Sequence, residues 1–266
     1  MTPLQEIRLR ENVWVFTLGG DRIETSYGAN CTAVIGRDSV LVVDPLIAPA
    51  FARLVDDSLR AKTTLPVSHV VLTHHHTDHA LGASWFAARG AAIAAHRACR
   101  EAMAKEHPGL VAARRRIPQL AELFRDAEPH LPGRLIEGSV SIDLGGTFPR
   151  VFHPGRGHTA GDLVVHLETE SLVVCGDLIS VGYHVNYEDA AVLDLQAGLD
   201  TLLGLEARTY VPGHGPAGGT EIVSAQFLYH AAARSAASPE ELRARYPDYL
   251  LSEILPQSVQ AWRKAL

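Results

Sequence analysis

The chain has 266 residues, of which 47% are hydrophobic and 20% are charged, a globular composition with enough apolar side chain for a large core. Its net charge of −6 provides no cationic surface for a phosphate backbone, which argues against nucleic acid as the main partner. Three irregularly spaced cysteines, a polar beginning and no long apolar run predict a single-domain cytoplasmic protein over 1–266, without disulfides, signal peptide or membrane partner.

The N-terminal part carries short β-branched runs separated by glycine and polar residues, a pattern that predicts a meander of strands. The expected strands are Val13–Leu18, Thr32–Ile35, Val40–Val43 and His69–Leu72. A helix over Ala80–Arg89 follows, with Gly90 as its C-cap, and then a strand over Ala91–Ala95.

The segment Arg97–Asp126 has mostly helical spacing, with expected breaks at His107-Pro108-Gly109 and at Pro118. We therefore expect a helical insertion over about 97–130. Its role is either a lid over the site or structural packing.

A second block of strands follows, and helices come after it. The expected strands are Val140–Leu144, Phe148–Phe152, Leu163–Leu167 and Leu172–Cys175. The expected helices are Leu193–Leu205 and Thr220–Ala237, with two closing helices over about 238–266. Two strand blocks with helices outside predict a layered α/β/α fold whose loops at one sheet edge carry function.

A cluster of histidines is the strongest chemical signal in the sequence. Six of the fourteen histidines lie between Val67 and His96, and four of them stand with an aspartate in the seven residues from Thr73 to His79. Imidazole and carboxylate are the ligands that Zn²⁺ and similar divalent ions take. In an extended loop the alternating His74 and His76 point to one side, so this segment indicates a metal site rather than a polar loop with a helix cap.

Three further candidates come after expected strands and are flanked by glycine: His158, Asp177 and His214. Glycine beside a ligand lets the backbone turn sharply and approach a buried ion closely. Taken singly, each could be an ordinary turn residue. Their agreement with one site is what supports them.

The HxHxDH pattern of residues 74–79 and the later motifs together resemble the metallo-β-lactamase superfamily over about residues 13–236. The later motifs are Pro154-Gly155-Arg156-Gly157-His158-Thr159, Gly176-Asp177 and Pro212-Gly213-His214-Gly215. The resemblance implies an α/β fold of the four-layer αβ/βα sandwich type. It also implies the ligand sets: His74, His76 and His158 for one metal ion, Asp78, His79 and His214 for the other, and Asp177 as a bridge. Asp44 matches an acid that orients such ligands, although a plain turn at the strand end is the alternative.

Two adjacent divalent ions lower the pKa of a shared water and stabilise the oxyanion formed when hydroxide attacks a carbonyl. We therefore expect a zinc-dependent hydrolase with two Zn²⁺ per chain, or iron or manganese in their place. Its substrate would be a small molecule with an activated carbonyl, such as an ester, thioester, lactone or cyclic amide. Asp78 and Asp177 are the candidate catalytic residues, because Asp78 can also orient the hydroxide or carry a proton to the leaving group.

Several alternatives stay open at this stage. One is a β-lactamase acting on antibiotics, but some lactamases have cysteine or histidine in place of Asp177, and many have a nearby lysine where this chain has Ser180 and Val181. A second is an oxidoreductase similar to a persulfide dioxygenase, with a single iron. A ribonuclease should carry a basic arm, and a non-catalytic binding module should have lost ligands, whereas all seven are present.

Substrate recognition is expected from the loop that follows Asp177, because it mixes aromatic and polar groups that could line a pocket. Its candidate substrate-binding residues are Tyr183, His184, Asn186 and Tyr187. The alternative is a surface turn whose tyrosines pack on their neighbours.

Overall fold

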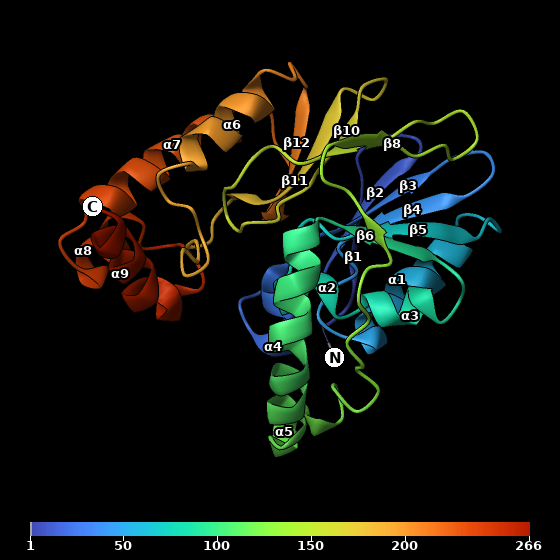
Figure 1. The fold of residues 1–266 in the computed structure, drawn as a ribbon, viewed down its shortest axis with the longest axis horizontal. Coiled ribbons are helices and arrows are strands. Elements are labelled where there is room, and N and C mark those ends of the chain that lie inside the picture. The colour runs from blue at the N-terminus through green and yellow to red at the C-terminus, as the bar shows by residue number, and fades with distance from the viewer. Residues whose placement is uncertain (1) are drawn as a thin grey trace.

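The computed structural model describes residues 2–266 and contains two β-sheets that pack face to face, each covered on its outer side by helices (Figure 1). The first sheet follows chain order: β1 (Gln5–Arg8), β2 (Val13–Thr17), β3 (Cys31–Ile35), β4 (Val40–Val43), β5 (Val67–Val71), β6 (Ala92–Ala95) and β7 (Arg134–Leu135). The second has the order β12 (Thr209–His214), β11 (Leu172–Ser180), β10 (Val164–Leu167), β9 (Arg150–Phe152) and β8 (Ser139–Ser141). The predicted four-layer α/β sandwich is confirmed.

Each sheet changes from antiparallel to parallel pairing along its width. Strands β1 to β4 pair antiparallel and β4 to β7 parallel, while β8 to β11 pair antiparallel and β11 with β12 parallel. Neighbouring parallel strands end at the same edge of a sheet. The ends of β4 and β5, and those of β11 and β12, therefore each bring residues distant in sequence together.

The core between the sheets is apolar on both sides. Val15 and Val43 from the first sheet pack in the same buried cluster as Val165 and Val211 from the second. Successive side chains of a strand point to opposite faces. Both faces of β4 are covered, so this strand is one continuous hydrophobic run, whereas a strand with one solvated face would alternate.

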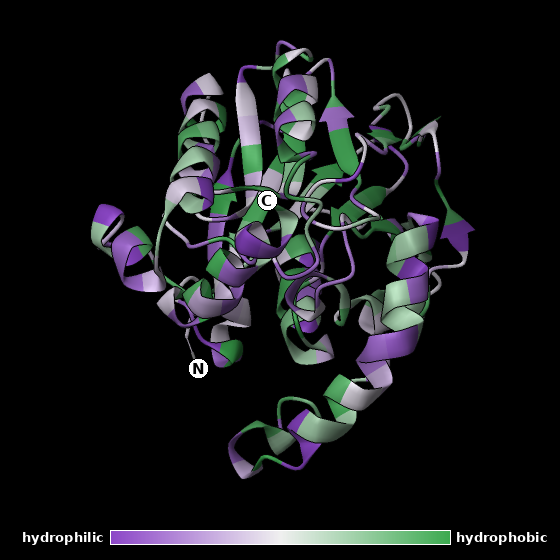
Figure 2. Ribbon diagram, turned by 60° about the vertical axis from the view of Figure 1, so that its left-hand side comes forward, coloured by the Kyte–Doolittle hydropathy of each residue, from purple (hydrophilic) through white to green (hydrophobic). Residues whose placement is uncertain are grey.

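Helices cover the outer faces of both sheets. The first sheet is covered by α1 (Pro49–Arg60) and α3 (Ala83–Ala87), and the second by α6 (Leu195–Leu203) and α7 (Thr220–Ser235). Val55 of α1 packs in one cluster with Val42 of β4, and Leu199 of α6 packs in another with Val173 of β11. Figure 2 shows that hydrophobic residues concentrate in the strands and along one side of these helices.

The remaining helices lie around the edge of the sandwich. They are η1 (Ile23–Gly28), α2 (Thr77–Ala80), α4 (Arg97–Arg115), α5 (Pro118–Ala121), α8 (Pro239–Arg245), η2 (Ser252–Ile254) and α9 (Leu255–Ala265). Helices α4 and α5 project from one side, while α8 and α9 pack near α7 at the other (Figure 1). Trp262 of α9 is buried in the same cluster as Tyr187 and Tyr229.

Several elements differ from the sequence predictions. The helix expected over Ala80–Arg89 is shorter, α3 over Ala83–Ala87, and a separate turn, α2, precedes it. The two are not continuous because the Gly82 N–H donates to the Leu46 carbonyl oxygen at 2.8 Å, outside the helix. The break expected at Pro108 is absent: α4 continues through it, and the preceding His107 holds the helix by donating to the His75 carbonyl oxygen. Strands β1 and β7 were not predicted, because they are short and exposed and lack an apolar pattern.

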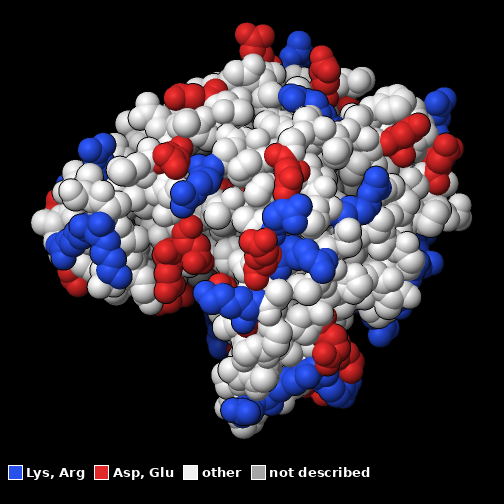
Figure 3. All heavy atoms as spheres, in the orientation of Figure 1, with Lys and Arg blue, Asp and Glu red and all other residues white. Residues whose placement is uncertain are grey.

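The three cysteines are buried free thiols. Within residues 2–266, no helix has both the length and the hydrophobicity needed to cross a membrane. On the face of residues 2–266 that Figure 3 shows, basic and acidic side chains are interspersed and form no broad basic surface.

Candidate metal centre

The structure brings the seven candidate ligands together at the edge where the strands of both sheets end. His74 and His76 lie in the loop after β5, Asp78 and His79 in α2, His158 between β9 and β10, Asp177 in β11, and His214 at the end of β12. Their side chains form two adjoining groups, and the carboxylate of Asp177 faces both of them. Four of the histidine side chains are at most 4% exposed, whereas Asp177, Asp78 and His76 are 10%, 15% and 19% exposed.

One group consists of Asp78, His79, His214 and one side of Asp177. The Nε2 atoms of His79 and His214 are 3.3 Å apart, and each is 3.4 Å from Asp78 Oδ2. Asp177 Oδ1 lies 3.2 Å from His79 Nε2, and Asp177 Oδ2 lies 3.4 Å from His214 Nε2. Zinc holds nitrogen and oxygen ligands at about 2.0–2.2 Å, which separates tetrahedral ligands by about 3.3–3.6 Å. The group thus has the spacing of a tetrahedral site.

The other group consists of His74, His76, His158 and Asp177. His158 Nε2 lies 2.9 Å from His76 Nδ1 and 3.5 Å from Asp177 Oδ2. The Nε2 atom of His74 is 4.0 Å from Asp177 Oδ2. The carboxylate of Asp177 therefore faces histidines of both groups, which is the geometry a bridging ligand needs.

Asp44 orients two of these histidines from behind. Its Oδ2 accepts hydrogen bonds from His79 Nδ1 at 3.1 Å and from Thr73 Oγ1 at 2.6 Å. Because the Thr73 hydroxyl donates to Asp44, its oxygen accepts from His74 Nδ1, 3.0 Å away. Both imidazoles then carry their proton on Nδ1, and the lone pair of Nε2 points toward the group. In metal-binding histidines the nitrogen that does not bind the metal commonly donates such a hydrogen bond.

Two other contacts orient the remaining rings. His214 Nδ1 donates to the Tyr27 carbonyl oxygen at 3.0 Å, which leaves its Nε2 free. His76 Nε2 donates to Asp189 Oδ2 at 3.0 Å, so that its Nδ1 faces His158 Nε2 inside the group, 2.9 Å away. The sequence did not predict Asp189, because it lies 113 residues after His76 in a loop and belongs to no motif.

The free nitrogen atoms fit a bound cation. With these hydrogen bonds, the lone pairs of His79 Nε2 and His214 Nε2 face each other. His74 Nε2 is buried and has no hydrogen-bond partner among residues 2–266. Lone pairs at such distances repel unless a proton or a metal ion lies between them, and leaving a buried polar nitrogen unpaired costs about 1–3 kcal/mol. The donor set, imidazole nitrogen with carboxylate oxygen, is the set that zinc and its neighbours bind.

Protonation can take the place of a cation in part of this centre. Although burial opposes it, the negative charge of Asp177 and Asp78 raises the pKa of His214 to about 9 and that of His79 well above its usual value. Burial dominates at His158, where it lowers the pKa to about 3. Without a cation these pKa shifts favour the protonated form of His214 and His79 and the neutral form of His158.

The strand β11 holds Asp177 in an unexpected way. The sequence predicted that the strand ends at Cys175, but β11 continues to Ser180 with an irregular register against β12. Asp177 thus extends from a strand and not from a turn. Gly213 of β12 lies directly against it, and a Cβ at that position would be 1.8 Å from Asp177 Oδ1.

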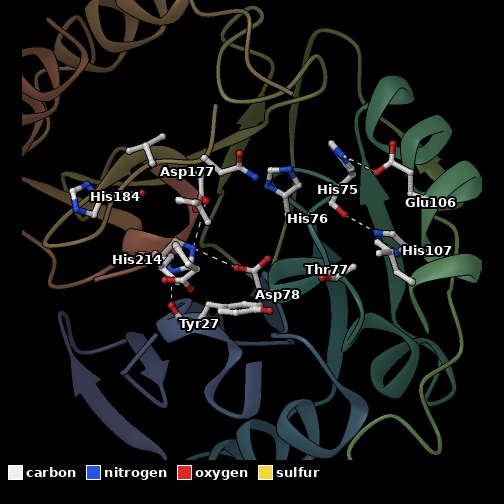
Figure 4. Close-up of a pocket in the computed structure, with 17 residues that line it drawn as sticks. Tyr27, His75, His76, Thr77, Asp78, Glu106, His107, Asp177, His184 and His214 are labelled. Carbon is white, nitrogen blue, oxygen red and sulfur yellow. Dashed lines mark hydrogen bonds and ion pairs between the residues drawn. The ribbon is translucent and has the colours of Figure 1, made fainter. Parts of the chain in front are cut away.

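A cavity of about 310 Å³ opens beside the centre (Figure 4). Its polar walls include Asp78, Asp177 and His214 from the centre. The other lining residues are Tyr27, His75, His76, Thr77, Glu106, His107, Leu110, Ser180, His184, Val185, Asn186, Leu251, Glu253 and Ile254. They come from η1, from the loop after β5 and the start of α2, from α4, from the end of β11 and the loop after it, and from the segment before α9. The predicted insertion therefore forms one wall.

The loop after β11 divides the four predicted substrate-binding residues. His184 and Asn186 line the cavity. Tyr183 and Tyr187 do not: the Tyr183 hydroxyl donates to the Gly20 carbonyl oxygen, and the Tyr187 hydroxyl bonds His230 Nδ1 inside the C-terminal helical cluster. The prediction for these two tyrosines is therefore corrected to packing, because their apolar rings are buried and each hydroxyl already has a partner.

Comparison with known proteins adds independent support for the fold. A family model described as the metallo-beta-lactamase superfamily matches residues 25–214. The chain is similar to a metallo-beta-lactamase type 2 of Elizabethkingia meningoseptica, with 25% identity over 183 residues, 68% of this chain and 65% of that protein. It is also similar to one of Bacillus sp. (strain 170), with 24% identity over 216 residues, 79% of this chain and 76% of that protein. The chain thus spans slightly less than two thirds of the length of the first relative.

Solved structures have the same fold at low sequence identity. A metallo-beta-lactamase from Pontibacter korlensis has a TM-score of 0.70 and 19% identity, and the match covers 85% of this chain and 97% of that one. A metallo-beta-lactamase from Pseudomonas aeruginosa, solved in a mono-zinc form, has a TM-score of 0.66 and 20% identity, with 87% and 96% covered.

Proposed function

The chain belongs to the metallo-beta-lactamase superfamily, and on that premise we propose that it is a hydrolase that uses two zinc ions to cleave an activated carbonyl in a small molecule. The observation that carries the proposal is the convergence of free histidine nitrogens and two carboxylates beside an open cavity. Relatives named metallo-beta-lactamases and a structural neighbour described in a mono-zinc form support hydrolysis and zinc.

In this proposal His74, His76 and His158 would hold one ion, Asp78, His79 and His214 would hold the other, and Asp177, which faces both groups, would be shared by them. When bound, the ions lower the pKa of a shared water and stabilise negative charge on a substrate oxygen. Asp78, which borders the cavity, can accept a proton there and pass it to the leaving group. Asp44 orients the ring of His79, and Asp189 orients the ring of His76, each by accepting a hydrogen bond from the ring nitrogen that does not face the group.

We propose His184 as a hydrogen-bond donor to the substrate. The Tyr229 hydroxyl oxygen accepts from the Val185 N–H at 3.4 Å and lies 2.8 Å from His184 Nδ1, and we propose that its O–H donates to this nitrogen. Burial lowers the pKa of His184 to about 4, and the neutral ring then carries its one proton on Nε2. That Nε2 is buried without a partner in a side chain that lines the cavity. It can therefore donate to a carbonyl oxygen of a bound substrate.

The cavity favours a neutral substrate. Its apolar walls include Leu110, Val185 and Ile254, and Glu106 and Glu253 add negative charge. None of its lining residues within 2–266 is a lysine or arginine. A substrate carboxylate at these walls, such as the one that β-lactam antibiotics carry, would meet the like charge of Glu106 and Glu253 and would find no basic side chain among the lining residues within 2–266. An ester, thioester or lactone with an apolar arm fits these walls better.

A substrate panel tests this proposal. The zinc-loaded protein would be assayed for kcat/KM with an alkyl-substituted lactone, an aryl ester, a thioester and a penicillin. We expect hydrolysis of neutral substrates, with the penicillin slower by at least about tenfold. Preference for the penicillin would favour the β-lactamase alternative. Oxygen consumption by a protein with one iron per chain would favour the persulfide dioxygenase alternative.

A further inference from the structure

His75 is the one histidine of the 74–76 run that the proposed centre does not use. Its side chain is 7% exposed, and its Nε2 is buried and has no hydrogen-bond partner in the part of the chain that the structure describes, residues 2–266. The backbone is held at this point, because His107 Nε2 donates to the His75 carbonyl oxygen at 2.6 Å. Figure 4 shows the ring turned toward Glu106 of α4, at the side of the cavity.

Two carboxylates face this nitrogen at distances that are too long for good hydrogen bonds. His75 Nε2 lies 3.5 Å from Glu106 Oε2 and 3.6 Å from Asp189 Oδ2. Nitrogen-to-oxygen hydrogen bonds have lengths of about 2.7–3.2 Å. Ligands that share a tetrahedral zinc ion stand about 3.3–3.6 Å apart, since each is about 2.0–2.2 Å from the metal. Both distances from His75 Nε2 therefore fit ligands that share a cation better than they fit hydrogen bonds.

We propose that His75, Glu106 and Asp189 form a further site for a divalent cation such as zinc, outside the seven-ligand centre. A neutral imidazole and two carboxylates carry a charge of −2, which one divalent ion balances. The donor set of one nitrogen and two carboxylate oxygens suits zinc and similar borderline ions. Water would complete the coordination, because the side chains of Glu106 and Asp189 are 36% and 42% exposed.

The site would connect two walls of the cavity. Glu106 belongs to α4, and Asp189 to the loop that follows β11. An ion bound between them fixes the helix to this loop at the side of the cavity. Asp189 also accepts a hydrogen bond from His76, which is a proposed ligand of the centre. The same carboxylate would therefore bind the outer ion and orient the His76 ring. Because of its exposed carboxylates, the outer site binds more weakly than the buried centre and exchanges its ion with solvent.

Zinc binding to the whole chain tests the site. Binding would be followed by calorimetry and equilibrium dialysis for the native protein, for Glu106→Gln and for Glu101→Gln. Glu101 is an exposed residue of the same helix with no ion pair or side-chain hydrogen bond among residues 2–266, which makes it a matched control. We expect a weaker class of one zinc ion in the native protein and in Glu101→Gln, and an affinity for it at least about tenfold lower in Glu106→Gln.

The number and affinity of the tightly bound zinc ions should be the same in all three proteins, because Glu106 touches none of the seven ligands. If no tightly bound zinc is found, this result counts against the proposed function and not against the outer site. In zinc-soaked crystals, the anomalous peak of the weaker ion should lie about 2.0–2.2 Å from His75 Nε2. The outer site is refuted by equal weak binding in the native protein and Glu106→Gln, by no weak binding up to millimolar zinc, or by a peak elsewhere.

Discussion

At the scale of single residues, the centre depends on which nitrogen of each imidazole is free. Asp44, the Tyr27 carbonyl and Asp189 each accept a hydrogen bond from one nitrogen of a ring, so that the other nitrogen faces the cluster. Asp177 then joins the two groups, since its oxygens lie 3.2–3.5 Å from histidines of both. This residue is the one whose charge both proposed ions share.

Replacing Asp177 by asparagine should therefore affect both ions. Asp177→Asn keeps the shape of the side chain but removes the negative charge, so we expect zinc content to fall and turnover to drop by at least about a hundredfold, while the fold is retained. Zinc analysis, activity and circular dichroism would measure this. Asp200→Asn, an exposed change on α6, is the matched control. Full activity and full zinc content in Asp177→Asn would remove this residue from the site.

The hydroxyl of Tyr229 should matter through His184. Tyr229→Phe removes the O–H that holds the His184 proton on Nε2, so we expect kcat to fall by about tenfold to a hundredfold with little change in zinc content. Tyr249→Phe is the control, because its ring stacks on Tyr229 but its hydroxyl makes no hydrogen bond within residues 2–266. An unchanged kcat in Tyr229→Phe would show that His184 does not act through this proton.

Zinc binding should release protons in a pH-dependent way. Burial opposes protonation, but Asp177 raises the pKa of His214 to about 9 from its usual 6.5. The stability that this charged histidine gives the metal-free protein is full below pH 6.5 and is lost as the pH rises through about 9. Zinc displaces the proton. Calorimetry in buffers of different ionisation enthalpy should show that zinc binding releases protons at pH 7 and that fewer protons are released toward pH 10. A number of released protons that does not change with pH would contradict the charge assigned to His214.

The sequence predicted much of this site, but only where residues share a motif. The alternating histidines of residues 74–79 indicated metal ligands, and the neighbouring glycines indicated Asp177 and His214 as further ligands. Asp189 and Tyr229 could not be predicted, because they act across the fold and their positions depend on how distant segments pack. Tyr183 and Tyr187 were predicted to bind substrate, because the sequence near a motif does not distinguish an aromatic residue that lines a cavity from one that fills a core.

At the scale of elements, the parallel pair β11 and β12 determines how closely the bridging carboxylate and His214 approach. Val174 pairs with Val211, but the register then shifts so that Gly176 pairs with Pro212 and Ser180 with His214. This irregular stretch lets Asp177 lean toward its neighbours. Such a shift carries no hydropathy signal, and for this reason the sequence predicted a strand that ended before Asp177.

Gly213 should be intolerant of a side chain. A Cβ there would lie 1.8 Å from Asp177 Oδ1, so Gly213→Ala must push the carboxylate or the strand aside. We expect destabilisation of about 1–3 kcal/mol and a loss of zinc affinity. Gly138→Ala, where no atom lies within 4 Å of the added Cβ, is the matched control. Denaturant unfolding and zinc titration would measure both. Equal behaviour of the two variants would mean that Asp177 is not held this tightly.

The course of α4 is a second case in which local sequence signals and tertiary structure disagree. Pro108 removes one backbone donor and normally ends or kinks a helix. Here the helix continues to Arg115, where Arg115 donates to the Phe124 and Ala127 carbonyl oxygens and Arg114 donates to Thr77 Oγ1. These contacts with distant segments hold the helix in place, and no local pattern could indicate them.

At the scale of the whole molecule, the two sheets meet in one apolar layer and their strand ends meet in one polar edge. The layers followed from the sequence because buried β-branched runs and amphipathic helices are regular patterns. We propose that residues 1–266 fold as one unit, since the inter-sheet core draws on both strand blocks. Each strand block alone supplies only part of the ligand set, so the site depends on this packing.

The central claim is that catalysis requires metal ions at this shared edge. The most direct test is a titration of zinc into the metal-free protein while the hydrolysis of a neutral ester or lactone is followed. We expect no hydrolysis without metal and a rise that reaches its plateau near about two tightly bound zinc ions per chain. Undiminished hydrolysis by a protein whose metal content is below detection would contradict the account.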